Sequence, residues 1–426
     1  MIDQNDVEVW TTSAGGDQRV GTLRPSFTGG RTLASSSFEY DAAFLVDGWQ
    51  ISPDLPLRPG RTYTAENSIL PGSFEDAAPD DWGQRLIRAD AARRRRAEPS
   101  LPTRFGDFDY LLGVADHTRM GALRFRSSLD GPWLSSDEGV ANLYDLQRII
   151  DAAQRYEQEE ATDEDIAYLG DVATSPGGAR PKANVVTAEG RLAIAKLPHS
   201  KDGRFDVERW EAITLEIARE AGLRTPTWRI EAPQHGRSVL ITERFDRDDE
   251  GFRLGYMSGR TALGLGTHDD GSRMTYEDFA DTIDAWSIAK TEDLHEMFGR
   301  IALSVLVNNV DDHWRNHGFL HTREGWRLAP MFDVNPSRQR GVIDSRAISA
   351  SDDPSDRQLV HLLAIADAFR LRPPAARAIL RRVAKSVSGW DATAARFGVG
   401  SAEREALGVA FDGAQLSWAL ALSSGE

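Results

Sequence analysis

One short segment constrains this chain more than any other. It reads Asn308-Asn309-Val310-Asp311-Asp312-His313-Trp314-Arg315-Asn316, and Asp333 follows within Phe332-Asp333-Val334. Kinase-type phosphoryl-transfer enzymes use an Asp to accept the proton of the attacking hydroxyl, then an Asn and a later Asp to hold Mg²⁺. Asp311, Asn316 and Asp333 have that spacing. Since Asp and Asn are common residues, the pattern needs support from the rest of the chain.

The composition indicates a folded protein of ordinary enzyme size. A length of 426 residues suits two to three packed units or one two-lobed enzyme, and 40% hydrophobic residues can form a sizeable core. The absence of cysteine excludes disulfides, thiolate zinc sites and a cysteine nucleophile. The sequence shows neither a long apolar run nor a secretory signal pattern, so we expect a cytoplasmic protein.

The charge argues against a broad nucleic-acid-binding surface. The net charge is −16, whereas such a surface is cationic. Four consecutive arginines at 93–96 are the local exception. We interpret them as a solvated helix end in preference to a phosphate-binding patch. The acidic run at 157–165 is expected to be a solvated linker.

The N-terminal part of the chain predicts a small sheet followed by helices. Up to about residue 60, alternating apolar and polar residues between Gly and Pro predict short strands, including 7–10, 38–40 and 43–46. Helical patterns follow at 70–87 and 107–112, and a strand is expected at 121–126. Helical spacing of Leu143, Leu146, Ile149 and Ile150 predicts a helix over 141–158.

A glycine-containing loop precedes two strands that end near a lysine. Backbone amides at Gly177 and Gly178 could hold phosphate oxygens because no Cβ blocks their approach, although an ordinary β-turn explains the loop equally well. Strands are expected at 183–187 and 191–198, and Lys196 lies at the far end of the second. Such a lysine is either a solvated edge residue or the kinase lysine that grips nucleotide phosphates.

A helix over 206–223 follows, with Asp206 as its N-cap and Gly222 at its end. Its apolar face carries Trp210, Ile213, Ile217 and Ala221. Glu211 lies at the border of that face. It could pair with Lys196, or it could face solvent.

The second half changes character after a connector. Strands at 227–230 and 238–242, joined by a turn at 234–236, lead into Glu243-Arg244-Phe245, where a kinase has the segment that binds adenine. Beyond it, helices are expected at 276–289, 291–307, 356–369, 374–387 and 402–420, with strand signals only near 319 and 326–328. These patterns predict an α+β, two-lobed, protein-kinase-like fold. Its parts are an accessory subdomain (1–165), a β-rich nucleotide-binding core (166–245) and a mostly helical catalytic lobe (246–426).

The joint order of these parts resembles that of protein kinases, and the detail resembles the HipA family of bacterial serine/threonine kinases, the toxins of toxin–antitoxin pairs. The resemblance covers nearly the whole chain. The matching segments are Leu111-Leu112-Gly113, Gly121-Ala122-Leu123-Arg124-Phe125, Ser175-Pro176-Gly177-Gly178-Ala179-Arg180-Pro181-Lys182, Ala195-Lys196-Leu197-Pro198, Glu243-Arg244-Phe245-Asp246-Arg247, Asn309-Val310-Asp311-Asp312-His313-Trp314-Arg315-Asn316 and Phe332-Asp333-Val334.

The resemblance implies a role for each matching residue. Asp311 would be the catalytic base, and Asn316 and Asp333 would hold Mg²⁺. ATP would be bound by a larger set: Gly177, Gly178, Ala179, Arg180, Lys182, Lys196, Glu211, Glu243, Arg244, Phe245, His313, Asn316, Phe332 and Asp333. Ser175 matches the serine that family members autophosphorylate. A phosphate there would repel ATP from the glycine loop, so we expect autophosphorylation to inactivate the enzyme.

Two departures from the kinase pattern are visible. Asn309-Val310-Asp311 replaces the His-Arg-Asp of eukaryotic kinases, and no Ala-Pro-Glu segment is evident, so activation-loop control of that kind is not expected. Asp312 adds a carboxylate next to Asp311, and the spacing to Asn316 favours Asp311 as the base.

Parts of the sequence are also compatible with three other functions. A metal-dependent hydrolase could use Asp311, Asp312, His313 and His317, but Trp314 stands where a helical zinc motif has Glu, and Gly318 disfavours a continuing helix. A binding module could dock on an antitoxin as a co-repressor, and a small-molecule kinase could share the architecture. We expect an ATP- and Mg²⁺-dependent serine/threonine kinase. Through the resemblance we expect a helix-turn-helix antitoxin as partner, indirect DNA contact, no membrane, and an aminoacyl-tRNA synthetase as a possible protein substrate.

Overall fold

The structure is a computed structural model that describes residues 6–13, 15–135, 139–174, 178–232, 237–338, 345–411 and 413–423, apart from the side chains of Ser13 and Tyr144. The chain divides into two compact units. The first comprises Met1–Lys201, Glu231–Met257 and Gly264–Asp269, and the second comprises Asp202–Ile230, Ser258–Leu263 and Asp270–Glu426. The predicted boundaries at 165/166 and 245/246 both fall inside the first unit, and the predicted turn at 234–236 lies outside the described residues.

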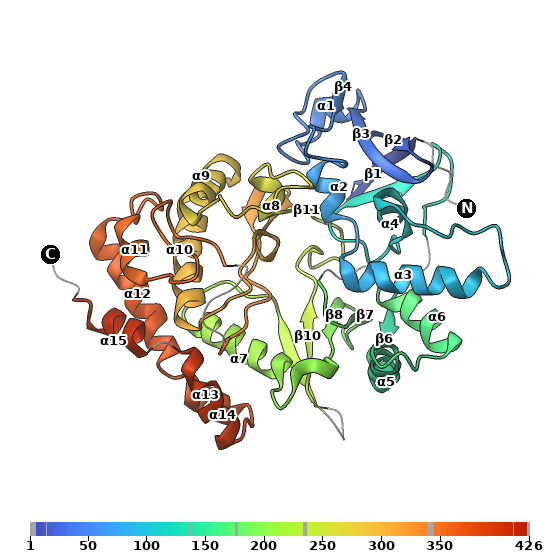
Figure 1. Ribbon diagram of the computed structural model, residues 1–426. Helices are drawn as coiled ribbons and strands as arrows, with labels where there is room; N and C mark the ends of the chain where they lie inside the picture. Colours follow the sequence, from blue (N-terminus) through green and yellow to red (C-terminus); the bar gives the residue numbers. More distant parts are fainter. Residues whose placement is uncertain are drawn as a thin grey trace. The chain divides into compact units, whose positions relative to one another are not determined.

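The first unit begins with an antiparallel sheet of five strands in the order β4-β3-β2-β1-β5 (Figure 1). Its buried side chains pack against three short helices, and they include Val9, Leu23, Phe38, Phe74 and Phe125. The strands are β1 (Val7–Ser13), β2 (Gly16–Thr28), β3 (Thr32–Tyr40), β4 (Arg61–Tyr63) and β5 (Leu123–Arg126), and the helices are α1 (Phe44–Asp47), α2 (Gly72–Asp76) and α4 (Asp107–Gly113).

The strand predicted at 43–46 is wrong, because these residues form helix α1. Asp41 starts the turn: its side chain accepts a hydrogen bond from the Ala43 amide, and its carbonyl accepts one from Leu45. An Asp that bonds the backbone two residues on is a typical turn signal. Only Phe44 of the four is buried, so the apolar run does not form a buried strand face.

The second sheet of this unit carries the predicted nucleotide-binding strands. Strands β6 (Ala141–Asn142), β7 (Lys182–Val186), β8 (Leu192–Lys196) and β10 (Val239–Glu243) follow one another in that order. Alternation puts Ala183 and Val185 on the face that joins the hydrophobic core, while Lys182 lies on the opposite face. The core is closed by α3 (Asp81–Arg94), α5 (Leu146–Glu157) and α6 (Asp163–Val172), which pack on one another.

The acidic run 157–165 is in part the solvated linker that we predicted, because residues 158–160 are exposed and connect two helices. Helix α5 ends at Glu157, and α6 begins at Asp163 after a capping box made by Thr162 and Asp165. Asp165 is 8% exposed and accepts hydrogen bonds from Arg155, so this carboxylate caps α6 and forms an ion pair, whereas Glu159, Glu160 and Glu164 are exposed. The predicted helix over 141–158 correspondingly starts later, at Leu146, after strand β6.

The arginine run closes helix α3. Arg93 pairs with Asp90, and Arg96 pairs with Asp163 of α6. The side chains of Arg94 and Arg96 are more than half exposed. This arrangement is the solvated helix end that the sequence favoured.

The second unit is mostly helical, which confirms the α+β class. The helix predicted at 206–223 is α7 (Val207–Glu220), and the Asp206 side chain caps it by accepting from the Arg209 amide. A hairpin of β12 (Gly318–Thr322) and β13 (Gly325–Leu328) follows the short turn η3 (Trp314–Asn316). The other helices are α8 (Gly259–Ala262), α9 (Tyr276–Trp286), α10 (Lys290–Leu306), α11 (Leu359–Ala364), α12 (Pro373–Val387), α13 (Trp390–Arg396), α14 (Ser401–Leu407) and α15 (Gly413–Ala421).

Two helix predictions were too long. Residues 356–369 contain only the short α11, and residues 402–420 are divided into α14, a 3₁₀ turn at Gly408–Ala410 and α15. Gly408 ends the helical pattern because glycine favours helix termini over helix interiors.

Strands β9 (Trp228–Glu231) and β11 (Gly255–Ser258) lie where the chain passes between the units. None of the described helices is both long and apolar enough to cross a bilayer.

A buried carboxylate ties helix α10 to the hairpin. Asp293 is fully buried and accepts hydrogen bonds from the Ser287 hydroxyl, the Leu328 amide and the guanidinium groups of Arg224 and Arg327. Burial raises the pKa of Asp293, but these donors outweigh burial and leave it below its ordinary value. The residue thus fixes the start of the segment that leads to Asp333.

Substitution of Asp293 by Ala should lower the free energy of unfolding by about 3 kcal/mol, because it leaves buried donors without their acceptor. Urea denaturation at neutral pH measures this change. Glu292→Ala is the matched control: its side chain is 77% exposed and also contacts Arg327. If both variants lose the same stability, Asp293 does not have this role.

Candidate active site

The loop after α10 turns two neighbouring aspartates in opposite directions. Asn308 has a left-handed backbone (φ 51°), and the Asn309 amide donates to the Ser304 carbonyl at the helix end. Beyond it, the side chain of Asp311 is 71% exposed, whereas that of Asp312 is 2% exposed. The two carboxylates therefore have different environments although they are adjacent in sequence.

Asp312 is bound on all sides by donors from three parts of the second unit. Its carboxylate accepts hydrogen bonds from the Tyr276 hydroxyl of α9 and from Arg357 (2.7 Å), and it lies 3.1 Å from His317 Nε2. Arg357 also donates to the Asn309 carbonyl. Burial raises the pKa of Asp312, but His317, Arg357 and Tyr276 outweigh burial and hold it well below its usual range. Asp312 is thus an ionised anchor of the loop.

The charge of Asp312 in turn affects the hydroxyl group of Tyr276. Burial, and next to it the negative charge of Asp312, raise the pKa of Tyr276 well above its ordinary value. Tyr276 therefore stays a neutral hydrogen-bond donor to the carboxylate. This network leaves Asp311 as the carboxylate that the loop presents to solvent.

The turn η3 gathers three of the predicted site residues. The Asn316 side-chain amide donates to the Asp311 carbonyl (2.8 Å), and the Asn316 backbone amide donates to the His313 carbonyl (2.9 Å). His313 Nε2 lies 3.7 Å from a carboxylate oxygen of Asp311. Because Asn316 uses its NH₂ group within the loop, its side-chain oxygen is the end available as a ligand for a hard cation.

The loop containing Asp333 lies beside the loop containing Asp311. The Asn308 side-chain amide donates to the Ser337 carbonyl (2.6 Å), and the Asn335 amide donates to the Asn309 side chain (3.5 Å). Asp333 has φ 56°, a left-handed conformation that is uncommon outside glycine and Asn or Asp. Such strained positions concentrate at functional sites. The structure therefore brings together the two segments that the spacing predicted would cooperate.

Two predicted phosphate-binding lysines face each other in the first unit. Lys182 of β7 and Lys196 of β8 are direct partners in the antiparallel ladder. Side chains at such positions lie on the same face about 5 Å apart at Cβ, and like charges directly opposite are destabilising. The strand register therefore gathers two positive charges on one face of the sheet.

The described part of the glycine loop is held by helix α3. Gly178 has φ 97°, and its amide donates to the Asp80 side chain. A Cβ at Gly178 would lie 2.5 Å from Lys182 Nζ, so a larger residue there would displace the lysine. Arg85 of α3 donates to the Ala179 carbonyl (3.0 Å), and Arg180 is half-buried. Ser175 and Gly177 lie outside the described residues.

The predicted connector shows a structural role that the motif did not reveal. Glu243 accepts a hydrogen bond from Arg191 (3.1 Å), and the Phe245 ring packs near Tyr256. Arg244 is buried, and its guanidinium binds Asp246 and the Thr118 carbonyl. Its side chain is therefore committed to the protein. Sequence reasoning missed Asp246 as a partner, although an acid between two arginines was a signal for it.

Glu211 is buried in helix α7 at 4% exposure, so the solvent-facing alternative for this residue is wrong. Lys196 belongs to the first unit and Glu211 to the second, and their pairing stays a prediction.

Phe332 is half-buried next to Asp333.

The hydrolase alternative loses its structural basis. His313 and His317 flank a 3₁₀ turn followed by strand β12, so they do not share a helical face. His317 is buried against Asp312 and Tyr276. Among the described residues, no group of three or more His, Asp or Glu side chains is arranged to hold a metal ion by itself.

Comparison with known proteins shows the family of this chain. The family described as HipA-like C-terminal domain matches residues 174–390, and the HipA N-terminal domain matches residues 8–126. The chain belongs to the HipA family. No curated protein matches its sequence significantly.

Two solved structures are similar to this HipA-family chain. One comes from the HipA, HipB and operator DNA complex of the Shewanella oneidensis MR-1 toxin–antitoxin system, with a TM-score of 0.67 and 17% identity over 97% of this chain and 96% of that one. It shows that the two chains share a fold. The other is the Helicobacter pylori proinflammatory kinase CtkA, with a TM-score of 0.38 and 14% identity over 56% of this chain and 92% of that one.

Substitution of Asp312 by Ala should lower the free energy of unfolding by about 3 kcal/mol at pH 7, because Arg357 and Tyr276 lose a buried acceptor. Urea denaturation of this variant and of Asp311→Ala measures the difference, and the exposed Asp311 should contribute little. Folding lowers the pKa of Asp312, so its contribution is complete above the unfolded value of 3.8 and is lost as the pH falls below it. Equal stability of the two variants would contradict the anchoring role.

Proposed function

We propose that this chain is an ATP- and Mg²⁺-dependent serine/threonine protein kinase. Membership of the HipA family and the shared fold support a protein kinase in general. The observation that carries the proposal is the pairing of the Asp311 loop with the Asp333 loop through Asn308 and Asn309.

In this proposal Asp311 is the catalytic base. Its exposed carboxylate can accept the proton of an incoming hydroxyl, whereas Asp312 cannot because it is buried and bound. His313 Nε2 lies 3.7 Å from the Asp311 carboxylate.

The oxygen donors of Asn316 and Asp333 fit Mg²⁺, which prefers carboxylate and amide oxygens and is held by few protein ligands. When bound, this ion supplies charge neutralisation at the transferred phosphoryl group. The protein's own part is to hold these two side chains: Asn316 through its bond to the Asp311 carbonyl, and Asp333 through its fixed left-handed backbone.

ATP would be held by residues of the first unit. Lys182 and Lys196 supply paired positive charge for phosphate oxygens, and Gly178 keeps the loop close to Lys182. Glu243 and Phe245 would hold the adenine, as the family resemblance implies. The resemblance also assigns autophosphorylation to Ser175.

We further propose a toxin role with a helix-turn-helix antitoxin as partner. The Shewanella oneidensis protein with the shared fold was solved with HipB and operator DNA. A net charge of −16 suits a protein that reaches DNA through such a partner and not through a cationic surface of its own. An aminoacyl-tRNA synthetase is the substrate class that the family resemblance suggests.

Asp311→Ala and Asp333→Asn should each lower phosphate transfer at least a hundredfold, because one removes the base and the other a charged metal ligand. Asn tolerates the left-handed backbone at position 333, so that variant removes the negative charge and keeps the backbone conformation. Incubation with radiolabelled ATP and cell lysate measures transfer and reveals the labelled protein. The exposed Asp356→Ala is the control and should stay active. Full activity of the Asp311 variant would refute the proposal.

Chelation by EDTA should abolish transfer, and added Mg²⁺ should restore it, because oxygen ligands bind this ion reversibly. The measurement is label incorporation before and after Mg²⁺ addition, with Zn²⁺ in a parallel reaction. Restoration by Zn²⁺ and not by Mg²⁺ would contradict Mg²⁺ as the metal of the proposed site.

A further inference from the structure

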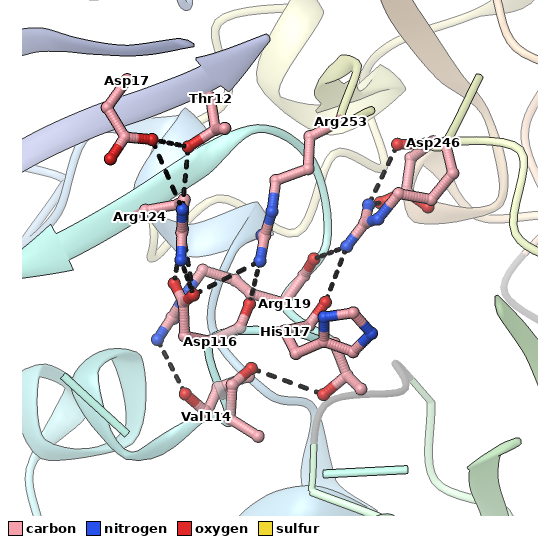
Figure 2. A network of polar contacts seen from close by, with 12 residues as sticks. Thr12, Asp17, Val114, Asp116, His117, Arg119, Arg124, Asp246 and Arg253 are labelled. Carbon is pink, nitrogen blue, oxygen red and sulfur yellow. Dashed lines mark hydrogen bonds and ion pairs between the residues drawn. The ribbon is translucent and has the colours of Figure 1, made fainter. Parts of the chain in front are cut away.

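A buried cluster of charged residues joins two parts of the first unit (Figure 2). Its carboxylates are Asp116, Asp246 and, at its exposed edge, Asp17, and its guanidinium groups belong to five arginines: Arg119, Arg124, Arg244, Arg247 and Arg253. Asp116 binds Arg124 and lies near Arg253, while Asp246 binds Arg244 and Arg247. The cluster thus contains more positive than negative side chains.

Arg244, Arg247 and Arg253 also donate hydrogen bonds to backbone carbonyls of the N-terminal domain. Arg244 donates to the Thr118 carbonyl (2.9 Å), and Arg247 donates to the carbonyls of His117 (3.0 Å) and Arg119 (3.1 Å). Arg253 donates to the Asp116 carbonyl, as Figure 2 shows. Residues 116–119 are therefore clamped by side chains that follow strand β10.

The fully buried carboxylate of Asp246 lies at the centre of this clamp. It accepts hydrogen bonds from Arg244 (2.6 and 2.7 Å), Arg247 (2.8 Å) and the Gly121 amide (2.7 Å). Gly121 has φ 75°, and a Cβ there would come within 3.2 Å of Tyr256. The carboxylate consequently fixes the chain at Gly121 and the chain at 244–247 to one another.

The two segments come from different family domains. Residues 116–121 lie in the matched N-terminal domain, and residues 244–253 lie in the matched C-terminal domain. Asp246 directly follows Phe245 and Glu243-Arg244 of the connector. Buried ion pairs are often no more stabilising than apolar packing, and a better-supported use is to specify one geometry. Here the geometry specified is that of the connector.

We propose that Asp246 is a positioning residue for nucleotide binding, through which residues 116–121 of the N-terminal domain set the backbone of the adenine-binding connector. This rests on the proposed function, in which Glu243 and Phe245 hold the adenine. The N-terminal domain then acts on ATP affinity without touching ATP.

The experiment compares Asp246→Asn with Asp165→Asn in the full chain. Asp165 is a matched control because it is also a little-exposed carboxylate of the first unit that binds an arginine (Arg155) and a backbone amide (Thr162). For each variant, Tm is measured without nucleotide, the Kd for MgATP by calorimetry, and KM and kcat for transfer well below Tm.

Both variants should have a lower Tm than the wild type. Only Asp246→Asn should raise the KM and Kd for ATP, by about tenfold, and its kcat should change less than about twofold. Arg247→Lys keeps the charge but loses the planar fork that reaches both Asp246 and the carbonyls of His117 and Arg119, so its KM should rise by a smaller factor. If Asp246→Asn does not fold, Arg247→Lys tests the proposal in its place.

Two results separate the possible failures. If the wild type does not bind MgATP, the proposed function fails. If it binds MgATP and both Asp246→Asn and Arg247→Lys keep the wild-type Kd, or if Asp165→Asn raises it equally, the proposed function stands and the positioning role of Asp246 is overturned.

Discussion

The candidate site depends on the burial of one negative charge beside an exposed one. The carboxylate of Asp312 lies in the interior of the second unit, where an unpaired charge would be strongly unfavourable. Donors from Tyr276, His317 and Arg357 offset this cost, and together they fix the path of residues 309–317. Asp311 is presented to solvent because its neighbour is held inside.

Buried carboxylates hold two other parts of the molecule in the same way. Asp293 holds the end of β13 to α10, and Asp246 holds the connector to the N-terminal domain. Loops have no ladder of backbone hydrogen bonds to define their geometry, so a buried carboxylate that accepts several hydrogen bonds can take over this role. In each case the fixed segment contains or adjoins a residue of the proposed active site.

The strand register adds a second electrostatic constraint. Because Lys182 and Lys196 are ladder partners, the sheet brings two positive charges to one place on the face that points away from the core. The opposite face is apolar and packs on α3, α5 and α6. One short hairpin thus supplies both a core contact and the two lysines of the proposed phosphate site, and helix α3 holds the glycine loop next to it.

The sequence by itself determined the order of the parts, the α+β class, the spacing of Asp311, Asn316 and Asp333, and the cap at Asp206. These features depend on local spacing and periodicity, which the chain carries in itself. Local rules failed at 43–46, at Asp165 and at 402–420, where a turn residue, a capping box and a glycine respectively overrode the apparent pattern. Only the tertiary structure distinguished Asp312 from Asp311, paired Lys182 with Lys196, and revealed the partners of Arg244 and Asp246. Those relations join residues far apart in the chain, and burial, which decides them, is a property of the packed fold.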